Sequence, residues 1–168
     1  MSLVKVAAAA RHLALGTVLT LAGCEPAPEP PMDPVYVPVT GNRSLPFSAA
    51  VRVGDMLYLS GQLGTDSSGA LVQGGIEPET RQTMENIRAV LEANGSSLAR
   101  VVKCLVMLAD MAEWGAMNQV YVTFFPDHLP ARSAMGASGL ALGARVEIEC
   151  IAVAGPEHSG ARPAPGSR

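Results

Sequence analysis

The segment PARSAMGASGLALGARVEIECIAV, residues 130–153, gives the clearest indication of the fold. Within residues 145–153 apolar residues alternate with two glutamates, and this period of two predicts a β-strand with one buried face. Arg132 stands near the start of the segment and Glu147 within the strand. An arginine can hold a carboxylate through two parallel hydrogen bonds, and a nearby glutamate could hold a water against the bound ligand. The segment therefore predicts a strand and a small-molecule site together.

Plainer explanations of both residues remain open. Arg132 could form an ion pair at an interface, with Glu147 as one candidate partner, because ion pairs are common and sites are rare. Glu147 could simply face solvent beside Glu149, because residues two apart on a strand share a face. The alternation by itself is compatible with each of these alternatives.

Strand and helix patterns alternate in the region before this segment. Gly54-Asp55 predicts a tight hairpin turn, and Gly95 and Pro126 end two helical patterns. The expected elements are a hairpin of residues 50–53 and 56–60, a helix over about 78–94, a strand over 101–108, a second helix from about 110 to 126, and a last strand over 145–153. The predicted order is ββαβαβ and the predicted fold class is α+β, with two helices on one face of a mainly antiparallel or mixed sheet. We expect Tyr58 and Trp114 to lie in the core.

Such a sheet leaves one apolar face without a helix to cover it. Burial of apolar surface stabilises a protein by ~25 cal/mol per Å², and the sequence offers no third helix for this face. We therefore expect a homo-oligomer in which the sheets of neighbouring subunits pack together.

The composition argues against several classes of protein. At 168 residues, with 48% apolar and 16% charged residues, the chain suits one folded domain with tails. A net charge of -3 without a basic cluster argues against a nucleic-acid partner. No metal is expected, because neither the cysteines nor the histidines have metal-ligand spacing; they are Cys24, Cys104, Cys150, His12, His128 and His158.

Cys104 and Cys150 both stand in apolar strand patterns. Buried free thiols are the simpler interpretation. A disulfide between them requires that their strands be adjacent and that the compartment be oxidising.

The amino terminus has the features of an export signal. Residues 1–23 have a basic start and then the apolar run LALGTVLTLAG, as in a secretory leader. With Cys24 this run resembles the bacterial lipobox, which implies cleavage before Cys24 and attachment of lipid to it. Glu25 at the next position favours the outer membrane, so we expect a periplasmic, lipid-anchored protein. A plain signal peptide with an incidental cysteine, or a start at Met32 that would give a cytoplasmic protein, are the alternatives.

Three further segments complete the expected organisation. Residues 24–39 are rich in proline, which predicts a fairly stiff tether. Residues 40–155 form the predicted domain, and residues 156–168 have the composition of a disordered tail.

Five short motifs at matching places along residues 38–155 resemble those of one family. They are Leu45-Pro46-Phe47, Ser60-Gly61-Gln62, the set Asn118, Tyr121 and Phe124-Phe125, Pro130-Ala131-Arg132-Ser133, and Val146-Glu147-Ile148. On these residues the chain resembles the Rid family of reactive intermediate deaminases, also called YjgF-type or RidA-like proteins.

The resemblance implies a chorismate-mutase-like subunit in a homotrimer, with sites between neighbouring subunits. It also implies cofactor-free hydrolysis of 2-imino or enamino acids, of the 2-aminoacrylate, 2-iminopropanoate or 2-iminobutanoate type, to 2-keto acids and ammonia. Arg132 would then hold the substrate carboxylate, helped by the backbone amide of Ala134, and Glu147 would hold the attacking water. Such chemistry needs mainly orientation of the substrate and a water.

The resemblance also places Phe47, Ser60, Gly61 and Tyr121 around the substrate. Two residues depart from the best-studied branch of the family. Phe47 stands where that branch has a tyrosine, and Ala134 stands where it has a cysteine, so one hydroxyl and one thiol are lost. The resemblance therefore implies deamination with an altered substrate range.

A second function class is a non-catalytic module that binds small carboxylates in the periplasm. It is motivated by the expected compartment, because the enzymes that release such imines are mostly cytosolic. The family has also been credited with ribonuclease activity. The sequence has no histidine pair or basic cleft for cleavage of nucleic acid, so we do not expect that activity.

Overall fold

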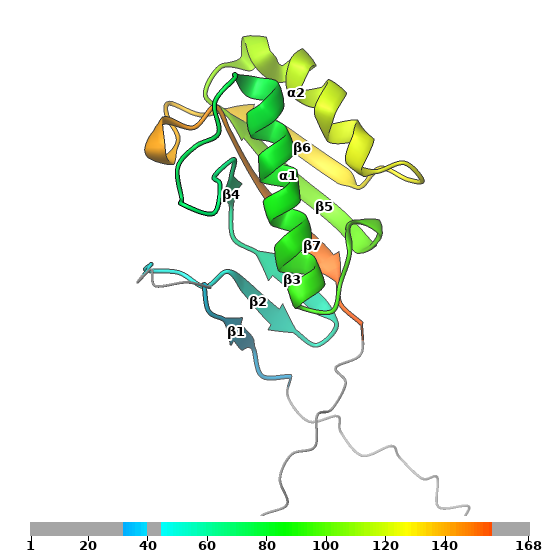
Figure 1. Cartoon of the computed structure of the whole chain (residues 1–168). Coiled ribbons are helices and arrows are strands. Elements are labelled where there is room, and N and C mark those ends of the chain that lie inside the picture. The colour runs from blue at the N-terminus through cyan, green and yellow to red at the C-terminus, as the bar shows by residue number, and fades with distance from the viewer. Residues whose placement is uncertain (1–31, 40–44, 156–168) are drawn as a thin grey trace, which may run out of the picture. The chain divides into compact units, whose positions relative to one another are not determined.

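The computed structural model describes residues 32–39 and 45–155. The strands are β1 (Val35–Val37), β2 (Ala50–Val53), β3 (Met56–Leu59), β4 (Gln62–Leu63), β5 (Val101–Leu108), β6 (Ala131–Gly136) and β7 (Val146–Val153). The helices are α1 (Ile76–Ala93) and α2 (Trp114–Tyr121), and the 3₁₀ turns are η1 (Leu98–Arg100), η2 (Met111–Glu113), η3 (Val122–Phe124) and η4 (Ala141–Gly143). These elements form a mixed sheet with two helices on it (Figure 1).

Strand β7 lies in the interior of the sheet. The strand order is β1-β2-β3-β7-β5-β6, and the short β4 also pairs with β7. Every pairing is antiparallel except that of β5 with β6, which is parallel. A parallel pair needs a crossover connection, and α2 lies in that connection.

Both helices pack on the same face of the sheet (Figure 1). The alternation predicted for the last strand is present: Val146, Ile148 and Cys150 are at most 2% exposed, whereas Glu147 and Glu149 are not buried. The core is completed by side chains of the helices and of β5; the largest of them are Met84, Ile87, Leu91, Met117, Val106 and Leu108. The α+β fold with two helices on one face is therefore confirmed.

Three strands are missing from the predicted order ββαβαβ. The short β4 lies in a stretch that glycines were expected to break, and β6 was missed because its sequence, ARSAMG, has no apolar alternation. Strand β6 is held instead by its parallel pairing with β5. Strand β1 corrects only the carboxyl end of the tether expected over residues 24–39, because Val35–Val37 pair with β2 and belong to the sheet.

The second face of the sheet is not covered by any described helix. Residues of this face alternate with the core residues, and several are apolar and partly exposed: Tyr58, Leu105, Met107, Ile151 and Val153. Tyr58 is 45% exposed, so the expectation that it lies in the core is wrong. It falls on the uncovered face because it alternates with the buried Leu57 and Leu59.

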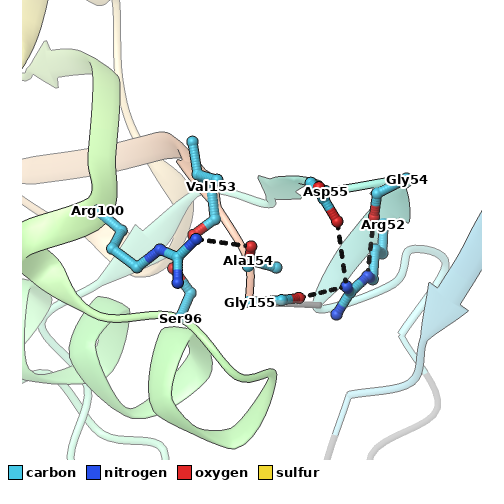
Figure 2. A network of polar contacts seen from close by, with 8 residues as sticks. All are labelled: Arg52, Gly54, Asp55, Ser96, Arg100, Val153, Ala154 and Gly155. Atoms are coloured by element: carbon cyan, nitrogen blue, oxygen red, sulfur yellow. Dashed lines mark hydrogen bonds and ion pairs between the residues drawn. The ribbon is translucent and has the colours of Figure 1, made fainter. Parts of the chain in front are cut away.

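Two arginines fix the end of β7 (Figure 2). The Nη2 of Arg52 donates to the carbonyl of Gly155 at 2.6 Å, and the Nη2 of Arg100 donates to the carbonyl of Ala154 at 2.9 Å. The hydroxyl of Ser96 donates to the carbonyl of Val153 at 2.8 Å. The last described residues are therefore tied both to the β2–β3 hairpin and to the connection between α1 and β5.

Cys104 and Cys150 form a disulfide between adjacent strands. The two residues face each other in the antiparallel register of β5 and β7, and both are at most 2% exposed. The simpler expectation of two free thiols is therefore wrong. Cys24 and the leader lie outside the described residues.

Neither helix of the described region has the length and apolar character needed to cross a membrane. Among residues 32–39 and 45–155, no group of histidine, cysteine and acidic side chains could hold a metal ion.

We predict that reduction of the disulfide lowers the free energy of unfolding by about 2–4 kcal/mol, because it restores conformational freedom to the unfolded chain. The test compares oxidised protein with protein refolded in reductant, by thermal unfolding and by counting free thiols. The double variant C104A/C150A should be indifferent to reductant. Equal melting temperatures of the oxidised and reduced wild type would contradict the prediction.

Candidate small-molecule site

Arg132 lies on the helix-covered side of the edge strand β6. Its guanidinium carbon is 4.8 Å from the ring centroid of Tyr121 and 5.9 Å from that of Trp114, both on α2. Trp114 is 43% exposed, so the expectation that it lies in the core is wrong. Its indole instead shields one side of a half-buried cation, and such contacts stabilise a guanidinium near an aromatic face.

Arg132 has no carboxylate partner in the described part of the chain. The ion pairs there are Arg52–Asp55, Arg88–Glu85 and Arg145–Glu113. The charge of the guanidinium is therefore not neutralised by a neighbouring acid. This is the state expected of an arginine that receives an anionic ligand.

Tyr121 adds a second unused polar group beside Arg132. The residue is 2% exposed, and its hydroxyl has no hydrogen-bond partner among the described residues. Burial raises the pKa of Tyr121 to about 12, against a lowering by the nearby Arg132 charge. The phenol is therefore protonated at physiological pH and can donate a hydrogen bond. Buried hydroxyls usually have a partner, so an unpartnered one indicates that a ligand or water completes the site.

Ala134 shares the face of β6 that carries Arg132, and it packs against the core. Its methyl group supplies no hydrogen bond, so only its backbone can assist the arginine. Strand β6 ends the strand order, and amides on the outer side of an edge strand have no strand partner. The expectation that the backbone amide of Ala134 helps to hold the substrate carboxylate requires such an unpaired amide.

Glu147 lies on the opposite face of the sheet. It alternates with Val146 and Ile148, which belong to the core beneath the helices. Gly61 lies directly against its carboxyl group, since a Cβ built on Gly61 would be 2.0 Å from Oε1 of Glu147. Partial burial raises the pKa of Glu147, and repulsion from Glu149 raises it further. The carboxyl group thus exchanges protons at a higher pH than an ordinary glutamate.

Ser60 lies at the same end of the sheet as Gly61. Its hydroxyl donates to the carbonyl of Ser48 at 2.7 Å, so it is used within the chain. Its amide donates to the carbonyl of Ala49 at 3.0 Å. Phe47, next to Ser48 in the sequence, is 52% exposed. The loop before β2 is therefore bound to the segment that contacts Glu147.

The structure separates these residues into two groups. In the register of the sheet, Arg132 faces Cys104 of β5, and Glu147 faces Met107 of the same strand. With β5 between them, β6 and β7 are roughly 10 Å apart, and the two side chains point to opposite faces. Within one chain Arg132 and Glu147 therefore form neither a common site nor the ion pair that was the alternative interpretation.

Two cavities of the described region lie away from Arg132 and Glu147. Two shallow cavities of about 360 and 470 Å³ share Ala99 and His128, and neither includes Arg132 or Glu147. The Nε2 of His128 lies 2.9 Å from the carbonyl of Ala99. These cavities have no buried unpartnered polar group at their walls and give no further candidate site.

Trp114 is the site residue that the sequence did not indicate. Trp114 and Tyr121 are two turns apart on α2, which places them on one side of the helix. That spacing was visible in the sequence. The contact of Trp114 with Arg132 is not visible in the sequence, because no pattern there predicts β6.

Comparison with known proteins identifies the family of the chain. The family described as "Endoribonuclease L-PSP" matches residues 41–154. The chain is 48% identical over 112 residues to a mouse protein named 2-iminobutanoate/2-iminopropanoate deaminase, which covers 66% of this chain and 83% of the mouse protein. A human protein of the same name is 42% identical over 112 residues, or 66% of this chain and 82% of the human one.

Solved structures show the same fold. A putative endoribonuclease L-PSP from Entamoeba histolytica superposes with a TM-score of 0.67 at 38% identity, covering 72% of this chain and 99% of that one. The YjgF gene product of E. coli gives a TM-score of 0.62 at 30% identity, covering 70% and 92%. With its motifs, its fold and these relatives in agreement, the chain belongs to the Rid family of YjgF- and RidA-type proteins.

Proposed function

We propose that this protein hydrolyses 2-imino acids, and their enamine tautomers, to 2-keto acids and ammonia. The observation that carries the proposal is Arg132, a half-buried cation that lies against two aromatic rings and has no carboxylate partner in the described chain. Relatives more than 40% identical are named 2-iminobutanoate/2-iminopropanoate deaminases, and this supports the same class of substrate.

Arg132 binds the substrate carboxylate in the plane of its guanidinium, while the rings of Tyr121 and Trp114 lie beside the guanidinium. The protonated hydroxyl of Tyr121 is a second donor at this end of the substrate. The arrangement orients the imine carbon, which is already electrophilic and needs only a water and proton transfers to react. No cofactor is required by this chemistry.

Glu147 supplies the proton transfers. Its carboxylate takes a proton from water as the oxygen bonds to the imine carbon, giving a carbinolamine. The imine reacts in its protonated form, and return of that proton to nitrogen makes the nitrogen a leaving group. As the C–N bond breaks, the hydroxyl proton passes to the carboxylate, so that ammonia leaves and the keto acid remains; the proton then moves from the carboxyl group to ammonia or water. A raised pKa suits a group that must both accept and release a proton near neutral pH.

The site requires a second copy of the chain. Arg132 and Glu147 lie on opposite faces of one sheet, so a single subunit cannot apply both to one substrate. The uncovered sheet face is apolar and can pack against a neighbouring subunit. We infer a homotrimer in which the Arg132 end of one subunit meets the Glu147 end of the next.

We also propose that the protein works after export, held by a lipid on Cys24. The disulfide between Cys104 and Cys150 supports this, because such bonds persist in oxidising compartments and are rare in the cytosol. The mass of the mature amino terminus tests the proposal: an unprocessed end, or a start at Met32, would contradict it.

We predict that the purified protein accelerates release of ammonia from freshly generated 2-iminopropanoate, and that Arg132→Ala lowers the rate at least 100-fold, since anchoring of the carboxylate is lost. Arg132→Lys keeps the charge without the fork and should retain a small part of the activity. Binding of pyruvate without any turnover would support the carboxylate-binding module instead. Rates equal to the spontaneous reaction, without binding, would refute both functions.

The shared site has its own test. Arg132→Ala and Glu147→Gln should each be inactive alone, whereas oligomers refolded from an equal mixture should recover about one quarter of the wild-type sites. Random pairing leaves that fraction with an intact arginine from one copy and an intact glutamate from the other. No recovery in verified mixed oligomers would place both residues in one subunit.

The variant Tyr121→Phe shows whether the hydroxyl of Tyr121 contributes to ligand affinity or to the stability of the fold. It removes a hydroxyl that has no partner among the described residues, so the melting temperature should stay the same or rise. Affinity for pyruvate, measured by calorimetry, should fall by about fivefold or more because a donor to the ligand is lost. A loss of stability with unchanged affinity would contradict the assigned role.

A further inference from the structure

Glu79 is a buried acid that the proposed mechanism does not use. It lies in the first turn of α1 and is 4% exposed. Its Oε1 accepts the amide of Arg145 at 2.6 Å and the amide of Val146 at 3.2 Å. Acids of this kind are rarely buried without a specific partner, and here the partners are the two residues that precede Glu147.

The sheet explains why these amides need a side chain. Strand β4 ends at Leu63, which faces Glu147, so it offers no acceptor to the residues before Glu147. Val146 is fully buried, and a buried amide without a hydrogen-bond partner destabilises the fold. The carboxyl group of Glu79 therefore replaces the missing strand neighbour at the start of β7.

The same side chain limits the position of β4. Gly64 follows β4 and is so close to Glu79 that an added Cβ would lie 2.5 Å from its Cγ. Gly61 precedes β4 and lies against the carboxyl group of Glu147. Strand β7, which carries Glu147, and strand β4, which pairs with it there, thus both contact Glu79 at their ends.

We propose that Glu79 is a positioning residue for the deamination, which holds the start of β7 and the end of β4 so that the carboxyl group of Glu147 stays aimed at the bound imine. The inference rests on the proposed function. Glu79 does not touch the substrate; it acts through the backbone on the residue that does. Because Arg132 lies on β6, whereas the hydrogen bonds of Glu79 go to the start of β7, we expect its binding of the carboxylate to be independent of Glu79.

Three substitutions and one control test this in the full-length protein. Glu79→Gln keeps the acceptor oxygen, Glu79→Asp withdraws it from the two amides, and Glu79→Met fills the space without an acceptor. The control is Thr80→Val, at the next and equally buried position of α1, whose hydroxyl has no partner among the described residues. Each variant is assayed for kcat, for pyruvate affinity and for amide exchange of the peptide spanning residues 144–149.

Glu79→Met and Glu79→Asp should lower kcat by about 10- to 100-fold, with pyruvate affinity within about twofold of wild type. Glu79→Gln and Thr80→Val should keep most of the activity. Faster amide exchange in the Met and Asp variants should be confined to the peptide that contains Glu147. Unchanged kcat in both variants, or a parallel loss of kcat and pyruvate affinity, would overturn the inference.

The same experiments distinguish failure of the proposed deaminase function from failure of the positioning role of Glu79. If the wild type shows no deamination, the exchange measurement still decides whether Glu79 holds the segment around Glu147. Faster exchange at residues 144–149 in Glu79→Asp, with normal exchange in Glu79→Gln, would support the positioning role. Uniformly faster exchange throughout the domain would show a general contribution to folding and overturn it.

Discussion

The antiparallel pairing of β7 with its neighbours is the constraint on which the rest of the structure depends. This strand joins β3 and β4 to β5, so it connects the hairpin half of the sheet to the half that carries α2 and β6. Its side chains alternate between a face buried under the helices and a face that no described helix covers. That alternation makes Val146 and Ile148 core residues and leaves Glu147 on the other side.

The division of the candidate site follows from this geometry. Arg132 is held on the helix side of β6 by Tyr121 and Trp114, whereas Glu147 is held on the open side by Gly61. Side chains of two strands separated by a third, and on opposite faces, cannot converge on a small molecule. The proposed function therefore requires association of subunits, and the same association would cover the apolar face of the sheet.

The two halves are supported by different interactions. Around Arg132 the support is aromatic packing, and a buried phenol is left with an unused donor. Around Glu147 the support is backbone: Gly61 fits only because it has no side chain, and Glu79 completes the hydrogen bonds of a strand whose neighbour is too short. The disulfide between β5 and β7 links the strands that lie between these halves.

The sequence by itself determined the helices, the hairpin and the last strand, because each of these buries apolar residues with a regular period. It also indicated Arg132 and Glu147, through their residue types and the motifs around them. Only the tertiary structure decided where they lie, because β6 has no apolar alternation and forms through its pairing with β5. The exposure of Trp114, the disulfide and the contact from Glu79 to β7 likewise depend on residues far apart in the chain. No local pattern encodes such contacts, since they arise only when the sheet brings those residues together.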